Sequence, residues 1–183
     1  MRLPILKGNT IHMRPLKRTD IPAIARGAHN KTISKFIPPI PYPYTVVEAR
    51  KWVNCVHRSA RADIAYQFGI ERISKEGIVG MMGLNNLNWS DKNAEIECWL
   101  ARPYWGKGFA SEALKLLLRF AFGELKLHRV YAMMVSINEP SVRLLERHDF
   151  TREANWRKAC RMNGGWHDVY AYGMLEEEAA KFK

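Results

Sequence analysis

The part of the sequence with the clearest chemical meaning is a short glycine-containing loop that precedes an apolar stretch. It runs Trp105-Gly106-Lys107-Gly108-Phe109-Ala110-Ser111. Glycine lets backbone amides come close to a ligand with no Cβ in the way. The free N–H groups of a first helical turn, at the positive end of the helix dipole, favour an anion. The loop therefore predicts a pyrophosphate cradle, and a loop that merely turns tightly is the alternative.

Other phosphate-binding loops fit this segment less well. A P-loop needs Ser or Thr directly after its lysine, whereas Gly108 follows Lys107. A dinucleotide-binding fingerprint needs a third glycine where Ser111 stands, and it follows a parallel βαβ unit. Neither pattern describes this chain.

The elements that must position the loop predict an α+β fold with a mostly antiparallel sheet. The predicted strands are 10–16, 65–73, 78–87, 94–100, 129–136, 150–161 and 166–175, and the predicted helices are 22–29, 46–61, 109–125 and 141–148. The middle strands are joined by connections too short for crossover helices, so they are expected to form an antiparallel meander. Residues 36–44 contain four prolines and favour a rigid, aromatic-lined loop. We expect one domain over residues 1–183, with a core of about 9–175 and a polar tail at 176–183.

Several blocks of this sequence together resemble the GNAT acetyltransferase superfamily, and in particular its RimJ/RimL-type branch, which includes acetyltransferases of ribosomal-protein N-termini. The blocks are Ala94-Glu95-Ile96, the stretch from Tyr104 to Ala113, Asn138-Glu139-Pro140-Ser141 and the corner His148-Asp149-Phe150. The resemblance covers about residues 9–175. It implies a twisted sheet, flanked by helices, that splays open between the fourth and fifth strands, with acetyl-CoA in the wedge and no metal.

The resemblance also implies direct attack of a neutral amine on the acetyl-CoA thioester in a ternary complex. Glu95 matches the strand position of the catalytic glutamate in histone-acetylating relatives, and is the expected base. Glu97 is the rival, because in a strand it shares a face with Glu95 and Trp99. Ordinary solvent-facing carboxylates are the alternative for both.

The remaining site residues are also implied by the resemblance. Ser141 is the expected acid toward the leaving thiolate, although Ser is also a favoured helix cap. Asn138 is expected to bond the pantetheine amide, although turn formation alone would also explain Asn-x-Pro. Backbone N–H groups near Trp99 and Leu100 are expected to contact the oxyanion and pantetheine. The aromatic residues of 36–44, with Trp52 and Trp156, either line the acceptor pocket or fill the core.

The sequence departs from the family pattern at three places. Trp105 stands where the signature has Gln or Arg, so any contact of that side chain is lost or replaced. Leu145 stands where many members have a Tyr that acts as the acid. Asp149 replaces the glycine of the corner before Phe150, and Asp tolerates the left-handed conformation better than most residues, so the turn can survive.

Charge is the main indication of the acceptor. The net charge is +11, and residues 1–90 carry 14 Lys and Arg against 5 Asp and Glu. A basic surface attracts anions, which mildly favours an acceptor that lives beside RNA, such as a ribosomal protein N-terminus. Two other hypotheses remain. The acceptor is a small amine, such as a polyamine or antibiotic, or the protein is a non-catalytic CoA-binding sensor.

The sequence also argues against a nucleic-acid partner, a membrane span, a disulfide framework and a zinc site. The basic residues are scattered along the chain, which argues against a direct nucleic-acid function. No apolar stretch reaches the length of a membrane span. The three cysteines are odd in number and widely spaced, so neither a disulfide framework nor a zinc site is expected, and the cytoplasm is the simplest location. The edge strand and the closing hairpin could pair with a second copy as a homodimer.

Overall fold

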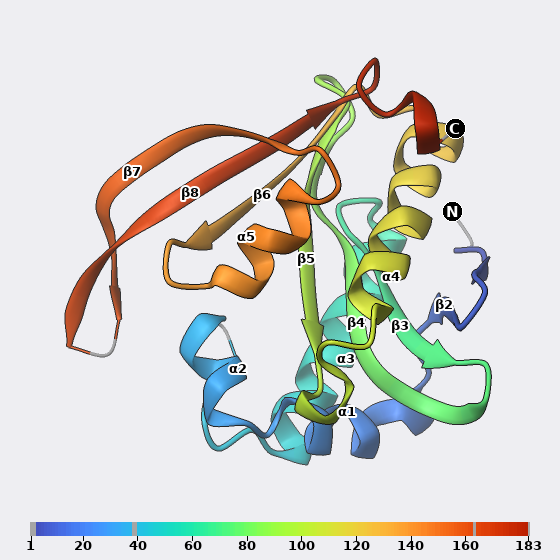
Figure 1. Ribbon diagram of the computed structural model, residues 1–183. Coiled ribbons are helices and arrows are strands. Elements are labelled where there is room, and N and C mark those ends of the chain that lie inside the picture. The colour runs from blue at the N-terminus through green and yellow to red at the C-terminus, as the bar shows by residue number, and fades with distance from the viewer. Residues whose placement is uncertain (1–2, 38–39, 163, 183) are drawn as a thin grey trace.

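A computed structural model describes residues 3–37, 40–162 and 164–182. Its strands form one eight-stranded sheet in the order β1-β2-β3-β4-β5-β6-β8-β7 (Figure 1). The strands are β1 (Leu6–Lys7), β2 (Ile11–Pro15), β3 (Tyr66–Arg72), β4 (Lys75–Asn88), β5 (Asn93–Leu100), β6 (Arg129–Val135), β7 (Thr151–Met162) and β8 (Gly165–Leu175). All neighbours pair antiparallel except β5 and β6, which are parallel. The predicted mostly antiparallel α+β fold is confirmed.

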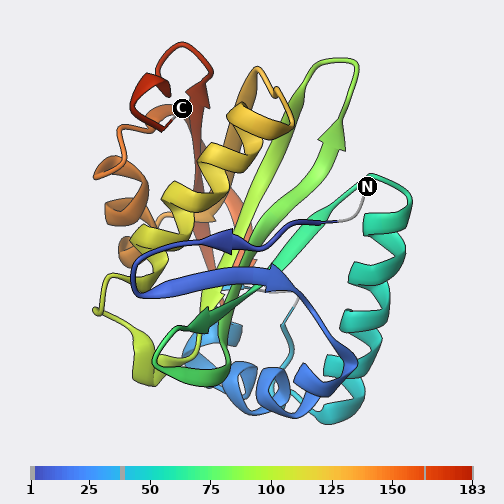
Figure 2. The ribbon, with the colours of Figure 1, turned by 90° about the vertical axis from the view of Figure 1, so that its right-hand side faces the viewer.

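The helices lie on both faces of this sheet (Figure 2). They are α1 (Ile21–Ala28), α2 (Lys31–Phe36), α3 (Val46–Arg61), α4 (Phe109–Leu118), which continues as a π-helical segment Arg119–Glu124, and α5 (Glu139–Glu146). Helix α4 packs on the face that carries the larger core, with Tyr66 and Phe68 of β3 beneath it. Helices α1 and α3 cover the opposite face, where Met81 of β4 belongs to a second core cluster. None of the helices in the described ranges is long and apolar enough to cross a membrane.

The predicted elements match the observed ones except at β1, which was not expected, and in three further places. Helix α2 was not expected; it forms because the Asn30 side chain accepts from the N–H groups of Thr32 and Ile33 and so caps its first turn. Residues 74–77, which separate the predicted strands 65–73 and 78–87, lie largely inside β4, because register shifts near the β3–β4 connection let that strand begin at Lys75. The C-terminal tail is not only polar, since Phe182 is buried in the larger core. Of the proline-rich loop, Pro38 and Pro39 lie outside the described residues.

The sheet opens between β5 and β6, the fourth and fifth of the predicted strands, as the resemblance implies. The two strands pair only from Asn93 to Glu95 on β5, against Arg129 to Tyr131 on β6. Beyond these three positions β5 continues beside β4 while β6 continues beside β8, so the strands diverge (Figure 1). The divergence leaves one edge of β5 without a strand partner over residues 96–100.

A buried ion network fixes the start of α1 to the sheet. Arg14 of β2 donates to both carboxylate oxygens of Asp20 at 2.9 Å, and its Nε donates to Glu71 of β3 at 2.8 Å. All three residues are buried. The Arg14 guanidinium is the largest cause that lowers the pKa of Glu71, to about 2. The network therefore joins β2, β3 and the 3-10 turn Arg18–Asp20 that leads into α1.

Removing the Glu71 carboxylate should destabilise the fold, because a buried guanidinium loses one partner. We expect Glu71→Gln to lower the free energy of unfolding at pH 7 by about 3 kcal/mol. The folded pKa of about 2 lies below the ordinary 4.5, so the wild type keeps this contribution above pH 4.5 and loses it as the pH falls toward 2. Urea unfolding across this range measures both effects.

The matched control is Glu153→Gln, which breaks the more exposed pair between Glu153 and Arg129. Its cost should stay within about 1 kcal/mol. An equal cost for the two variants, or an unchanged acid slope in Glu71→Gln, would contradict this account of the network.

Candidate active site

The glycine loop leads into α4 with the backbone geometry that a cradle needs. Gly106 and Gly108 have φ of +70° and +80°, the left-handed region that favours glycine. A Cβ built on either would meet no protein atom within 4 Å, so the space above both is open. The first intrahelical bond runs from the N–H of Glu112 to the carbonyl of Gly108. The N–H groups before it have no helical acceptor and can bind an anion.

A groove of about 480 Å³ extends from this loop to the diverging end of β5. Every residue predicted to bind the cofactor lines it: Trp99, Leu100, Trp105, Gly106, Lys107, Gly108, Phe109, Ala110, Ser111, Asn138 and Ser141. The structure thus brings together residues from β5, the loop, α4 and α5. Tyr104, Arg143 and Arg147 also line the groove and were not singled out from the sequence. Nothing in their spacing distinguishes them from surface residues.

The free edge of β5 supplies backbone groups to this groove. The N–H of Ala101 donates to Val79 of β4, and hydrogen bonding alternates along a strand. The N–H groups of Cys98 and Leu100 therefore face the wedge, whereas that of Trp99 faces β4. The indole N–H of Trp105 donates to the Leu100 carbonyl at 2.6 Å. The residue that replaces Gln or Arg of the signature thus holds the loop against the strand edge.

A second contact ties the loop to the corner after α5. The Ser111 hydroxyl lies 2.6 Å from Nε2 of the buried His148. The next residue, Asp149, has φ of +62°, so the corner keeps the left-handed turn without a glycine, as expected. The pairing of Ser111 with His148 could not be predicted from the sequence, because 37 positions separate the two residues.

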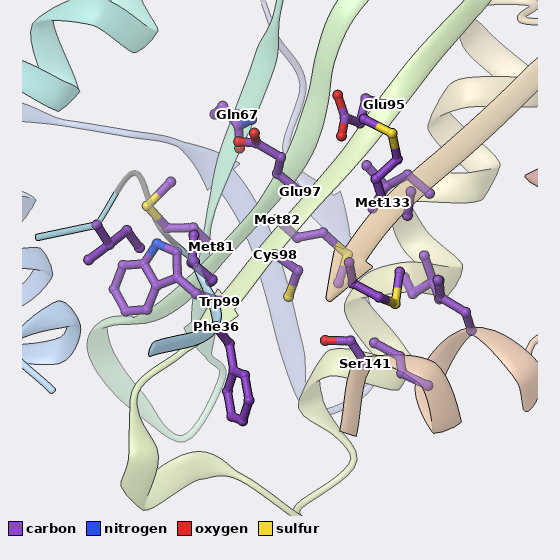
Figure 3. A pocket seen from close by; sticks show the side chains of 18 of the residues that line it. Phe36, Gln67, Met81, Met82, Glu95, Glu97, Cys98, Trp99, Met133 and Ser141 are labelled. Carbon is purple, nitrogen blue, oxygen red and sulfur yellow. The ribbon is translucent and has the colours of Figure 1, made fainter. Parts of the chain in front are cut away.

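A second cleft of about 280 Å³ lies on the other side of the opening (Figure 3). Glu95, Glu97 and Ser141 all line it. Its apolar wall includes Phe36, Ile37, Ile40, Tyr44 and Trp52, so aromatic residues of the 36–44 loop do line this cleft. Trp156 does not; it lies on β7 and is 50 % exposed, so its expected place in the pocket was wrong. Among the described residues no three His, Cys, Asp or Glu side chains converge as metal ligands.

The two carboxylates of β5 have different surroundings. Glu95 accepts a hydrogen bond from Asn86 at 2.9 Å. Loss of hydration in the cleft raises the pKa of Glu97, a hydrogen bond from Asn85 lowers it, and the charge of Glu95 raises it, with a net increase. Part of Glu97 remains exposed because it also borders a neighbouring polar groove. A carboxylate with a raised pKa is a better proton acceptor near neutral pH.

Cys98 and Ser141 lie where the two clefts meet, since both residues line both. Burial raises the pKa of the Cys98 thiol to about 12, which keeps it protonated. Helix α5 begins at Glu139, so Ser141 is the third residue of the helix and does not cap it. Asn138 occupies the cap position, and its side chain makes no capping hydrogen bond. Leu145, which stands where many family members have a Tyr, is buried in the core.

A polar extension of the second cleft was missed by sequence reasoning. Gln67, Asn85 and Asn86 line an adjoining groove that shares Trp52, Gln67 and Glu97 with the cleft. The Gln67 amide donates to Asn85 at 2.8 Å. These amides come from two neighbouring strands, so only the register of β3 against β4 brings them together.

Residues 10–151 match the family model described as "Acetyltransferase (GNAT) domain". The chain belongs to the GNAT acetyltransferase family. It is therefore an acetyltransferase, and the fold expected from the resemblance is confirmed.

Individual relatives differ in the acceptor that their names give. The chain is 32 % identical over 178 residues to "Probable N-acetyltransferase YjcK" of Bacillus subtilis, covering 95 % of this chain and 98 % of that protein. It is 37 % identical over 101 residues to "Putative ribosomal N-acetyltransferase YdaF" of Bacillus subtilis, 55 % of each protein. It is 25 % identical to "Spermidine N(1)-acetyltransferase" of Vibrio cholerae, covering 91 % of this chain and 93 % of that protein.

Solved structures share the fold. The structure of RimL, described as a ribosomal L7/L12 α-N-protein acetyltransferase in complex with coenzyme A, superposes with a TM-score of 0.88. The match covers 96 % of this chain and 99 % of that one at 21 % sequence identity. The splayed sheet is thus the shared framework.

A side chain in the cradle should block cofactor binding. We expect Gly108→Val to lose measurable acetyl-CoA binding in isothermal titration, because its Cβ and methyl groups enter the open space above the loop. The matched control is Gly164→Val, at the same φ of +80° in the β7–β8 turn. Both variants should lose about 1–2 kcal/mol of stability from backbone strain, but only the first should lose binding. Unchanged affinity in Gly108→Val would contradict the cradle.

Proposed function

We propose that this acetyltransferase moves the acetyl group of acetyl-CoA to the N-terminal amine of a protein, by direct attack in a ternary complex. The observation that carries the proposal is the meeting of two clefts at the diverging end of β5. One contains the glycine cradle, and the other contains two carboxylates and an apolar wall. A thioester held in the first and an amine held in the second would meet beside Cys98 and Ser141.

The cradle residues fit the pyrophosphate of acetyl-CoA, which supplies the acetyl thioester. The open backbone at Gly106 and Gly108 and the free N–H groups of α4 suit the diphosphate. The wedge-facing N–H groups of Cys98 and Leu100 suit the amide groups of an extended pantetheine arm and an oxyanion. Arg143 and Arg147, which line the groove, add positive charge for the phosphates.

The chain's own residues then handle two protons. Glu95 or Glu97, directly or through a water, takes the proton of the attacking amine as the new N–C bond forms. The C–S bond breaks, and the departing sulfur receives a proton from the Ser141 hydroxyl, which regains one from water. Binding both substrates in adjoining clefts also aligns them before reaction.

The lining of the acceptor cleft favours a peptide over a polyamine. Within its described lining, Glu95 and Glu97 are the carboxylates, sufficient for one ammonium group before it loses its proton. A polyamine carries several cations that need several carboxylates along its length. The amides of Gln67, Asn85 and Asn86 in the adjoining groove can instead pair with peptide groups, and the apolar wall can hold a first side chain.

The named relatives and the net charge support a ribosomal protein as the acceptor. YdaF is named as ribosomal and shares 37 % identity over about half of this chain. A net charge of +11 attracts the protein to anions such as RNA, which favours an acceptor that lies beside RNA. We therefore propose a ribosomal protein as the acceptor and the cytoplasm as the location, in keeping with the free thiols of Cys55, Cys98 and Cys160.

The direct test is to incubate the protein with acetyl-CoA and matched acceptors, and to detect acetylated product by mass spectrometry. The acceptors are a set of peptides with free N-termini, the same peptides with blocked N-termini, and spermidine. We expect product from the free peptides and the acetyl group at the α-amine. Faster turnover of spermidine, or acetylation of the blocked peptides on lysine, would contradict the proposed acceptor.

The base is tested by isosteric amides on β5. Glu95→Gln should lower kcat by about 10²-fold or more while acetyl-CoA affinity is unchanged. Glu97→Gln is measured in parallel, and wild-type turnover in Glu95→Gln would move the role to Glu97. If Glu97 is the base, its raised pKa should place the acid limb of kcat/KM above the ordinary 4.5 of a glutamate.

Ser141 is tested as the acid. Ser141→Ala should lower kcat by about 10²-fold, and Ser141→Thr, which keeps a hydroxyl, should recover part of the rate. Because Ser141 does not cap α5, the free energy of unfolding should change by no more than about 0.5 kcal/mol. A rate loss that follows a fall in stability would contradict an acid role.

A further inference from the structure

A basic groove lies on the outer face of α3, separate from both clefts of the active site. Its volume is about 470 Å³. It is lined by Arg18, Lys51, Asn54, His57, Arg58 and Arg61. Among the described residues that line it, none is a carboxylate or an apolar residue.

Two parts of the chain form the groove. Lys51, Asn54, Arg58 and Arg61 recur at intervals of three or four residues, which places them on one stripe of α3. At 1.5 Å per residue the stripe spans about 15 Å from Lys51 to Arg61. Arg18 comes from the turn held by the buried Arg14 network, and His57 bonds to the Leu16 carbonyl at 2.9 Å. The fold thus fixes the two parts together.

The positive charge of the groove is largely uncompensated. Within the described ranges, Arg18, Arg58 and Arg61 take part in no ion pair, and Lys51 approaches Glu48 only to 4.0 Å. The stripe opposite, with Ala49, Val53 and Val56, is buried against the sheet. Figure 2 shows α3 along the outer side of the molecule, with no element covering it there.

We propose that this groove binds the phosphate backbone of a polynucleotide. Three guanidinium groups can each bind a phosphate through two parallel hydrogen bonds. A linear row of cations matches a linear row of phosphates. A membrane surface would require apolar side chains beside the cations, and the lining has none. The proposal does not depend on the amine acceptor.

The fold gathers charges that the sequence leaves apart. Arg18 and Lys51 are 33 positions apart, so the basic residues look scattered in the sequence, and this pattern argued against a direct nucleic-acid function. Trp52, one residue after Lys51, lines the acceptor cleft. A polynucleotide on the outer face of α3 would therefore lie about one helix diameter, 10–12 Å, from the acceptor.

The test is the affinity of the full chain for fluorescently labelled single-stranded RNA and DNA of one mixed sequence, measured by anisotropy. Three or four phosphate contacts predict a slope of about −2 to −3 in log affinity against log salt. Affinity should then fall about 20- to 50-fold between 50 and 200 mM salt. RNA and DNA should bind with similar affinity, since the phosphate backbone is the ligand. Poly-glutamate should displace the labelled strands poorly.

Two variants with equal net charge isolate the groove. The groove variant carries Arg18→Gln, Lys51→Gln, Arg58→Gln and Arg61→Gln, and should bind at least about tenfold more weakly at 50 mM salt with a flatter salt dependence. The control variant carries Lys75→Gln, Lys115→Gln, Arg119→Gln and Arg161→Gln, four exposed cations elsewhere, and should bind like the wild type.

Circular dichroism checks that both variants fold. If the groove variant does not fold, the double variant Arg58→Gln with Arg61→Gln should still show about half of the expected change in the slope of log affinity against log salt. Absence of binding by the wild type at 50 mM salt would overturn the proposal. The proposal would also be overturned if the control variant lost as much nucleic-acid affinity as the groove variant. The same holds if poly-glutamate displaced the labelled strand as well as unlabelled nucleic acid does.

Discussion

The structure depends on the point at which β5 and β6 stop pairing. Three paired positions hold the strands together, and beyond Glu95 each follows a different neighbour. A strand edge without a partner has N–H and C=O groups that still need hydrogen bonds. The Trp105 indole satisfies the Leu100 carbonyl, and the N–H groups of Cys98 and Leu100 remain available to an extended ligand. The glycine loop, α4 and α5 are all arranged around this opening.

The opening also separates two kinds of chemistry. On one side, backbone N–H groups and arginines suit phosphates; on the other, Glu95 and Glu97 suit an amine. The two sides adjoin where Cys98 and Ser141 line both clefts. Burial at this junction keeps the thiol of Cys98 neutral, and loss of hydration in the second cleft raises the pKa of Glu97, which favours proton transfer near neutral pH.

Much of this was predictable from local sequence, because local physics decides it. The glycine loop, the meander and the left-handed Asp149 each depend on residues close together in the chain. The sequence could not show contacts that require the folded register, such as Ser111 with His148, the amides of Gln67 and Asn85, or Arg18 beside α3. Trp156 was misplaced for the same reason, since an aromatic side chain suits a pocket and an exposed hairpin equally well from sequence alone.

The most direct test of the account is an NMR titration of the ¹⁵N-labelled protein with acetyl-CoA. The account predicts that the largest changes in backbone amide shifts occur at Cys98 and Leu100 on the free edge of β5 and at residues 106–111 of the cradle. The amides of β7 and of the outer face of α3 should change little. Shifts that cluster away from the β5 edge, or an absence of shifts at saturating acetyl-CoA, would contradict the claim that the divergence of β5 and β6 forms the cofactor site.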